Sequence, residues 1–202
     1  MNKQIDCVFL VVSSSKKSYQ ELSETYSAIE PPTWALLLAQ SMRAEKNKVA
    51  IVDANAEKLS EKEIFLRIKD LNPKLICMVV YGQNVNAGTA NMSGATHISK
   101  FLKDQKIKQK ICFIGSHVQA LPKETLEKEE SIDFVFTNEG VYALRNILKL
   151  KNFENEQLKD IKGIAFRNNY KDVIMNLPEK VVPTERMDFD LPGYAWDLLP
   201  YD

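Results

Sequence analysis

The sequence has little of what marks several common protein classes. Its 202 residues include only three cysteines, Cys7, Cys77 and Cys112, and these lack CxxC spacing, which excludes a recognisable zinc or disulfide framework. The 27 basic and 27 acidic residues cancel, so no basic surface for nucleic acid is indicated. No apolar run approaches the roughly 18 residues of a membrane helix, and the N-terminus lacks a signal-peptide cleavage pattern. We therefore expect a cytoplasmic protein with buried free thiols that binds neither nucleic acid nor a membrane.

Strand and helix patterns alternate over residues 1–150. Near-continuous apolar runs are typical of parallel strands that are buried on both faces, and they occur five times: Ile5–Val12, Val49–Asp53, Leu75–Val80, Lys110–Ile114 and Asp133–Phe136. Helical patterns follow them at Pro32–Lys46, from Ser60 to before Pro73, and at Ala90–Asp104, Pro122–Lys128 and Gly140–Leu148. This alternation predicts an α/β fold with a doubly wound, flavodoxin- or Rossmann-like, five-stranded parallel sheet.

The rhythm changes in residues 151–202. Residues 162–176 read as a β-hairpin with an Asn-Asn turn, and the remaining tail is rich in proline. We interpret 1–150 as one ligand-binding domain, and 151–202 as a hairpin extension followed by an extended linker.

Polar, almost uncharged loops follow the third, fourth and fifth predicted strands. Ligands of open α/β sheets bind at the carboxyl ends of the strands, so these loops supply the candidate site residues: Tyr81, Gly82, Gln83, Asn84, Gly115, Ser116, His117, Asn138, Glu139 and Gly140. Glycines permit close backbone approach, and amides and hydroxyls both donate and accept hydrogen bonds. This chemistry favours a neutral ligand fringed with amides over a polyphosphate. The same residues are also ordinary turn and cap formers.

The chain resembles the N-terminal cobalamin-binding domain of class B radical S-adenosylmethionine enzymes. The resemblance extends over nearly the whole length and is carried by the order and spacing of six stretches: residues 31–39, 49–54, 115–117, 138–140, 160–167 and 190–200. It implies that cobalamin is the cofactor, bound by the loop residues above together with Pro32. It also implies a parent protein that is a radical enzyme, most simply a methyltransferase, with a C-terminal radical domain as partner. This chain alone is then expected to hold a carrier rather than to catalyse.

Two departures bear on that resemblance. In the family, a CxxxCxxC motif binds a four-iron cluster beside S-adenosylmethionine. Here the cysteines are scattered, so we expect this chain not to bind the cluster and to be either an excised domain, with the cluster and S-adenosylmethionine in the rest of the parent protein, or a degenerate relative. Mutase-type cobalamin domains place Asp-x-His-x-x-Gly after the first strand, with the histidine on cobalt. Here Ser13–Tyr19 contains no histidine. The resemblance therefore implies base-off cobalamin without a histidine lower ligand, with Tyr81, Gln83 or Asn84 approaching that face.

Two other readings share the expected fold. A receiver domain needs an acidic pair after the first strand and an aspartate after the third, where this chain has serines and Tyr81. A flavodoxin-like interaction or flavin-binding domain remains the alternative. Asp53 ends the second strand, but no GxGxxG follows the first strand, so we interpret it as a cap. His97, on a predicted helix, is interpreted as structural, and Trp34 either packs in the core or flanks the ring.

Overall fold

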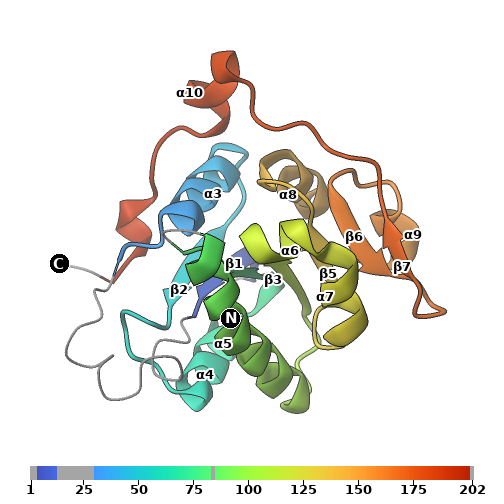
Figure 1. Ribbon diagram of the computed structural model, residues 1–202. Coiled ribbons are helices and arrows are strands. Elements are labelled where there is room, and N and C mark those ends of the chain that lie inside the picture. Colours follow the sequence, from blue (N-terminus) through green and yellow to red (C-terminus); the bar gives the residue numbers. More distant parts are fainter. Residues whose placement is uncertain (1–3, 13–29, 83–84, 201–202) are drawn as a thin grey trace.

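A sheet of seven strands forms the centre of the computed structural model, which describes residues 4–12, 30–82 and 85–200 (Figure 1). The strands are β1 (Ile5–Val11), β2 (Val49–Asp53), β3 (Pro73–Val79), β4 (Lys110–Ile114), β5 (Phe134–Phe136), β6 (Ile164–Arg167) and β7 (Val173–Met175). Their order in the sheet is β2-β1-β3-β4-β5-β6-β7. The first five are parallel, and β6 and β7 are antiparallel to their neighbours.

Helices cover both faces of this sheet. Those in the described residues are α3 (Thr33–Ala44), α4 (Glu61–Leu71), α5 (Val85–Asp104), α6 (Ser116–Ala120), α7 (Pro122–Lys128), α8 (Val141–Leu148), α9 (Asn155–Leu158) and α10 (Met187–Asp190), with 3-10 turns η1 (Thr184–Arg186) and η2 (Trp196–Leu198). None of them is both long and apolar enough to cross a membrane. The predicted α/β class is confirmed, but the sheet has seven strands and not five, because β6 and β7 extend the same sheet beyond β5.

The two faces of the sheet carry separate cores. Successive residues of a strand point to opposite faces, so Cys7 and Phe9 of β1 pack toward α3 and α8, whereas Val8 and Leu10 pack toward α4 and α5. Both sets are fully buried. Burial on both sides explains why the parallel strands read as continuous apolar runs.

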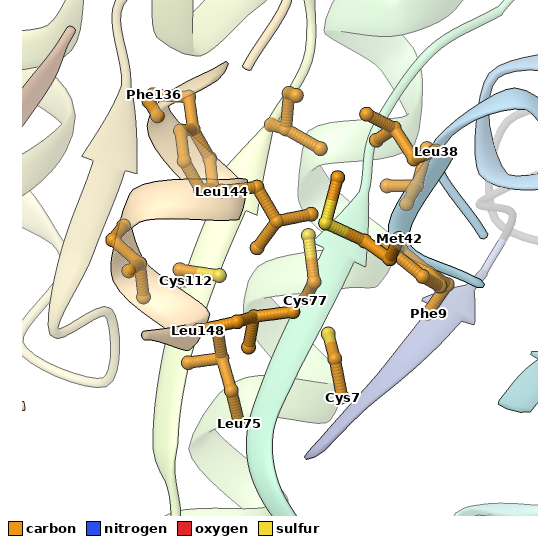
Figure 2. Packing of buried hydrophobic residues seen from close by; sticks show 14 of the residues in the cluster. Cys7, Phe9, Leu38, Met42, Leu75, Cys77, Cys112, Phe136, Leu144 and Leu148 are labelled. Atoms are coloured by element: carbon orange, nitrogen blue, oxygen red, sulfur yellow. The ribbon is translucent and has the colours of Figure 1, made fainter. Parts of the chain in front are cut away.

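The three cysteines lie on the α3–α8 face of the sheet, on the adjacent strands β1, β3 and β4 (Figure 2). All three are buried free thiols, as predicted. Burial raises the pKa values of Cys7 and Cys112 well above the ordinary thiol range, and the neighbouring thiol Cys77 adds to the effect. These groups therefore stay protonated and act as small core residues.

Helix α4 begins and ends where the sequence predicts. Ser60 Oγ accepts from the Glu63 backbone N–H at 3.4 Å, and Glu63 Oε2 accepts from the Ser60 N–H at 2.7 Å, which completes the predicted capping box. Ser60 Oγ also donates to Glu63 Oε2 at 2.6 Å, and this hydrogen bond, together with the one from the Ser60 N–H, lowers the pKa of the Glu63 carboxyl. Asn72 ends the helix in the left-handed conformation, and Pro73 starts β3, the strand position where a missing N–H does least harm.

Two helices depart from the sequence prediction. Helix α5 starts at Val85 rather than Ala90, and α6 occupies Ser116–Ala120, where the sequence indicates a loop. The stretch 85–90 contains Val, Asn, Gly and Thr, which are weak helix formers, so its local signal is poor. Packing between α5 and α6 outweighs that propensity.

Residues 177–199 form a strap that runs from β7 across the outside of α8 and α3 (Figure 1). Asp190 of α10 joins the strap to the rest of the fold through several hydrogen bonds. The Asp190 carboxylate accepts from Arg145 at 2.7 Å and from the Tyr142 hydroxyl at 2.6 Å, and its backbone carbonyl accepts from Ser41 Oγ at 2.6 Å. Arg145 and Tyr142 lie on α8 and Ser41 on α3, so this cluster ties the strap to both helices.

Candidate functional site

The carboxyl ends of β1, β3, β4 and β5 meet at one edge of the sheet because these strands are parallel. Strand order reverses between β1 and β3, which is where open α/β sheets bind ligands. The segment after β1, in which the sequence shows no histidine, lies outside the described residues. The described part of this edge therefore consists of the segments that follow β3, β4 and β5, together with the start of α3.

Tyr81 follows β3 and is held by three helices. Its ring packs against Trp34 of α3, with ring centroids 5.6 Å apart. Its hydroxyl oxygen accepts from Gln119 Nε2 of α6, and its backbone carbonyl accepts from Asn91 Nδ2 of α5 at 3.2 Å. Burial raises the pKa of Tyr81 to about 12. The hydrogen bond from Gln119 lowers this pKa, whereas the negative charge of Glu139 raises it further. Tyr81 is therefore a neutral phenol at physiological pH.

Two glycines allow the backbone segments of this edge to come close together. A Cβ on Gly115, at the end of β4, would lie 2.1 Å from the Val80 carbonyl oxygen. A Cβ on Gly88, in the first turns of α5, would lie 2.4 Å from Ser116 Oγ. That hydroxyl is buried and has no hydrogen-bond partner among the described residues. Ser116 therefore offers a polar group at the edge that the described fold does not satisfy.

A groove of about 380 Å³ opens between α5, α6 and α7. His117, the predicted site residue that follows Ser116, lies at this groove with Thr89 Oγ1 at 3.4 Å from its Nδ1. The lining combines hydroxyls, apolar groups and a few charges: Thr89, Met92, Ser93, Thr96, His117, Leu121, Glu124, Thr125, Lys128 and Glu129. Such a surface accepts a group that is partly apolar and carries hydroxyls or a phosphate.

The segment after β5 is bonded to the strap. Asn138 Oδ1 accepts from the Gly140 N–H at 2.9 Å, and its Nδ2 donates to the Glu179 carbonyl at 2.9 Å. Glu139 Oε1 accepts from the Val182 N–H at 2.5 Å. Gly140 adopts φ +78° just before α8, a conformation that favours glycine. The side chains of Asn138 and Glu139 thus hold the strap at this edge.

Gln119 and Trp34 join the segments that follow different strands. Gln119 Nε2 donates to the Asn138 carbonyl at 2.7 Å as well as to Tyr81. Trp34 Nε1 donates to the Glu139 carbonyl at 3.2 Å while its ring contacts Tyr81. Sequence reasoning missed Gln119, because the short helix that carries it was read as a loop. Its only signal in the sequence is a position four residues after Gly115.

The structure brings most of the predicted site residues to one edge. Those placed there are Tyr81, Gly82, Gly115, Ser116, His117, Asn138, Glu139 and Gly140. Pro32 precedes α3 and is half-buried, two residues before Trp34. Gln83 and Asn84 lie outside the described residues. Residues 85–89, which precede the predicted start of the helix at Ala90, also lie on helix α5.

The two residues that were interpreted as structural are engaged within the protein. Asp53 Oδ1, at the end of β2, accepts from the Ala56 N–H at 3.0 Å, which confirms the cap. His97 Nε2 lies 2.5 Å from Glu61 Oε1 and links α5 to α4. Neither group lies at the carboxyl edge after β3, β4 or β5.

Comparison with known families shows which family the chain belongs to. The family model described as the B12 binding domain matches residues 22–148, well over half of the chain. The chain belongs to the B12-binding domain family. Cobalamin, the cofactor expected from the sequence, is therefore confirmed as the ligand of its family. The match spans α3 to α8 and includes every described segment of the carboxyl edge.

Related proteins place this B12-binding domain within longer chains. An uncharacterized methyltransferase of Pyrococcus horikoshii is 27% identical over 172 residues, which are 85% of this chain and 35% of the relative. The cobalamin-dependent S-adenosylmethionine radical enzyme OxsB, solved with aqua-cobalamin and S-adenosylmethionine, shares the fold with a TM-score of 0.68 at 18% identity, over 97% of this chain and 25% of its own. The radical S-adenosylmethionine methyltransferase TsrM of Kitasatospora setae shares the fold with a TM-score of 0.62 at 15% identity, over 85% of this chain and 30% of its own. This chain thus spans about a third or less of the length of each of these three proteins.

Proposed function

We propose that this domain binds cobalamin base-off, without a histidine on the lower face of cobalt, and serves a radical S-adenosylmethionine methyltransferase. The observation that carries the proposal is the carboxyl edge itself: an uncharged polar rim after β3 and β4, whose residue His117 also lines the groove between α5, α6 and α7. Family membership supports the cofactor. The longer relative and the two radical enzymes that share the fold support the parent activity.

The residues at this edge suit the cofactor. Gly115 lets the segment after β4 pack closely against the backbone of Val80 after β3, and the unsatisfied hydroxyl of Ser116 offers a hydrogen bond. Thr89, His117 and the threonines of the groove would hold the nucleotide tail, which combines an aromatic base with a ribose and a phosphate. The neutral phenol of Tyr81 suits the amide fringe of a corrin. When bound, cobalamin supplies the carrier of a methyl group, and the protein binds and orients it.

Binding is tested with the 202-residue chain and aquacobalamin. We expect co-elution from a size-exclusion column and a shifted visible spectrum, with no comparable retention of flavin mononucleotide. Retention of the flavin with no uptake of cobalamin would overturn the proposal. The groove is tested by Ser93→Phe, which places a ring among its lining residues. This variant should weaken binding at least about tenfold, whereas Asp104→Phe, at the far end of α5, should leave it unchanged.

The ligation state is tested by electron paramagnetic resonance of the bound cob(II)alamin. A base-off cofactor without a histidine shows no nitrogen superhyperfine splitting. If the spectrum does show nitrogen superhyperfine splitting, a nitrogen ligates cobalt and this part of the proposal is refuted. The same spectrum of His117→Ala separates the two nitrogen sources: loss of splitting assigns the ligand to His117, and persistence assigns it to the cofactor's own base.

The parent activity is tested by the coding sequence downstream of Asp202. We expect a CxxxCxxC motif in the same reading frame, and a protein of the full length that consumes S-adenosylmethionine under reducing conditions. A stop codon directly after this chain, with no such motif in a neighbouring gene, would refute the assignment to a radical enzyme. It would leave the cobalamin proposal standing.

A further inference from the structure

Gln119 occupies a position between two of the segments that form the proposed cobalamin rim. Its side-chain nitrogen faces two oxygens, the Tyr81 hydroxyl and the Asn138 backbone carbonyl, the latter at 2.7 Å. A carbonyl oxygen can only accept, so the group that faces it is the amide NH₂ and not the amide oxygen. The second amide hydrogen is donated to Tyr81. The phenol oxygen therefore accepts from Gln119, and its own O–H remains a donor for another partner.

Tyr81 is restrained from other directions as well. Trp34 contacts one side of the ring, and Asn91 donates to the backbone carbonyl at 3.2 Å. The Tyr81 side chain can still rotate about its χ1 and χ2 torsions, which would move the hydroxyl. The hydrogen bond from Gln119 to the hydroxyl oxygen opposes that rotation. Gln119 lies on the short helix α6, which Gly115 and Ser116 connect directly to β4. The orientation of the phenol is therefore set by the rigid end of a strand.

We propose that Gln119 is a positioning residue for the cobalamin site: it fixes the Tyr81 phenol so that its O–H donates to an amide of the corrin fringe. This rests on the proposed function. It assigns Tyr81 the role of a neutral hydrogen-bond donor rather than of a cobalt ligand. A ligand to cobalt would have to be the phenolate, and burial, which raises the pKa of Tyr81 to about 12, makes the phenolate scarce at neutral pH.

A double-mutant cycle tests this role. Tyr81→Phe removes the hydroxyl and keeps the ring, and Gln119→Met removes the amide and keeps the length. A neutral hydrogen bond contributes about 1 kcal/mol, so each variant should weaken aquacobalamin binding about five- to tenfold. Because Gln119 acts through the Tyr81 hydroxyl, the double variant should bind as Tyr81→Phe does, within about twofold. Gln105→Met, which lies just past the end of α5, is the matched control and should bind normally.

Several results would overturn the inference. If the fold losses of cobalamin affinity in the two single variants multiply in the double variant, Gln119 does not act through Tyr81. The same conclusion follows if Gln119→Met binds cobalamin with wild-type affinity. A changed cobalt absorption spectrum in Tyr81→Phe would make Tyr81 a ligand, whereas a donor role leaves the band positions of the bound cofactor unchanged. Restoration of affinity in Gln119→His, whose ring N–H can donate, would support the donor role. A merely structural residue would not be rescued in this way.

A measurement without cobalamin separates this inference from the proposed function. In a Trp196→Phe background, Trp34 is the remaining tryptophan, and its ring contacts Tyr81. Gln119→Met should shift or quench its emission, and Gln105→Met should not. An unchanged emission refutes the positioning role whether or not the wild-type chain binds cobalamin. Failure of the wild-type chain to bind, with the emission change present, would refute the cobalamin proposal and the donor role but leave the contact between Gln119 and Tyr81 intact.

Discussion

Removal of the Asp190 carboxylate is the sharpest test of how the strap is held. Asp190→Ala leaves the guanidinium of Arg145, whose side chain is 9% exposed, without its nearest counter-ion. Removal of one partner of a buried ion pair costs about 3–5 kcal/mol, because the other charge stays buried and unpaired. Glu45 Oε1 lies 3.5 Å from Arg145 Nη1 and offers a partial replacement. We therefore expect the lower end, a loss of about 3 kcal/mol in the free energy of unfolding.

A second variant distinguishes charge from packing. In Arg145→Met/Asp190→Leu both charges are replaced by apolar groups of similar volume. Such replacements of buried ion pairs are often neutral or stabilising. The double variant should therefore be more stable than Asp190→Ala, although it removes more polar atoms. This ordering follows only if the unpaired charge, and not the loss of contacts, causes the destabilisation.

Urea unfolding followed by far-ultraviolet circular dichroism measures both differences. Limited proteolysis reports release of the strap, since residues 177–199 should be cut faster in Asp190→Ala. Asp188→Ala, at an exposed position of the same helix α10, is the control and should behave as wild type. The carboxylate does not hold the strap as described if Asp190→Ala and Asp188→Ala lose the same free energy of unfolding. The double variant proving the least stable of the three would have the same meaning.

Three further outcomes are expected. Hydrogen bonds from Arg186 and Tyr142, with Arg145, hold the pKa of Asp190 well below its usual range. Its stabilisation is therefore fully present above about pH 4 and is lost progressively as the pH falls further, so the difference in melting temperature between wild type and Asp190→Asn should shrink steadily below about pH 4. Gly115→Ala should lower the free energy of unfolding by about 1–3 kcal/mol in urea and weaken cobalamin retention, because its Cβ meets backbone at 2.1 Å. Arg167→Met should lower the free energy of unfolding in urea by about 2 kcal/mol, because this guanidinium donates to four backbone carbonyls at the end of α7 and in the segment that follows it.

Much of the fold could be predicted from local sequence. The five parallel strands are apolar because both of their faces are buried, and that pattern is visible without coordinates. The capping box at Ser60 and the proline at the start of β3 are equally local signals. The glycine at position 115 and the polar segments after β3, β4 and β5 marked the edge of the sheet where the candidate site lies.

The sequence could not show which of these polar groups are already engaged. Asn138 and Glu139 read as candidate ligand contacts, but their side chains bond to residues 179 and 182 of the strap. Gln119 carried no signal beyond its position after Gly115, yet it bridges the segments after β3 and β5. Such partners are about 20 to 40 residues apart in the chain, so only the packing of the strands brings them together.

The sequence by itself determined the alternation of strands and helices, the buried thiols and the edge of the sheet at which the candidate site lies, because hydrophobic periodicity, capping and turn residues act over a few neighbours. The tertiary structure alone decided the early start of α5, the extension of the sheet to seven strands and the attachment of the strap through Asp190. These features depend on contacts between distant segments, where the packing of Gly88 against Ser116 or the burial of Arg145 outweighs local propensity.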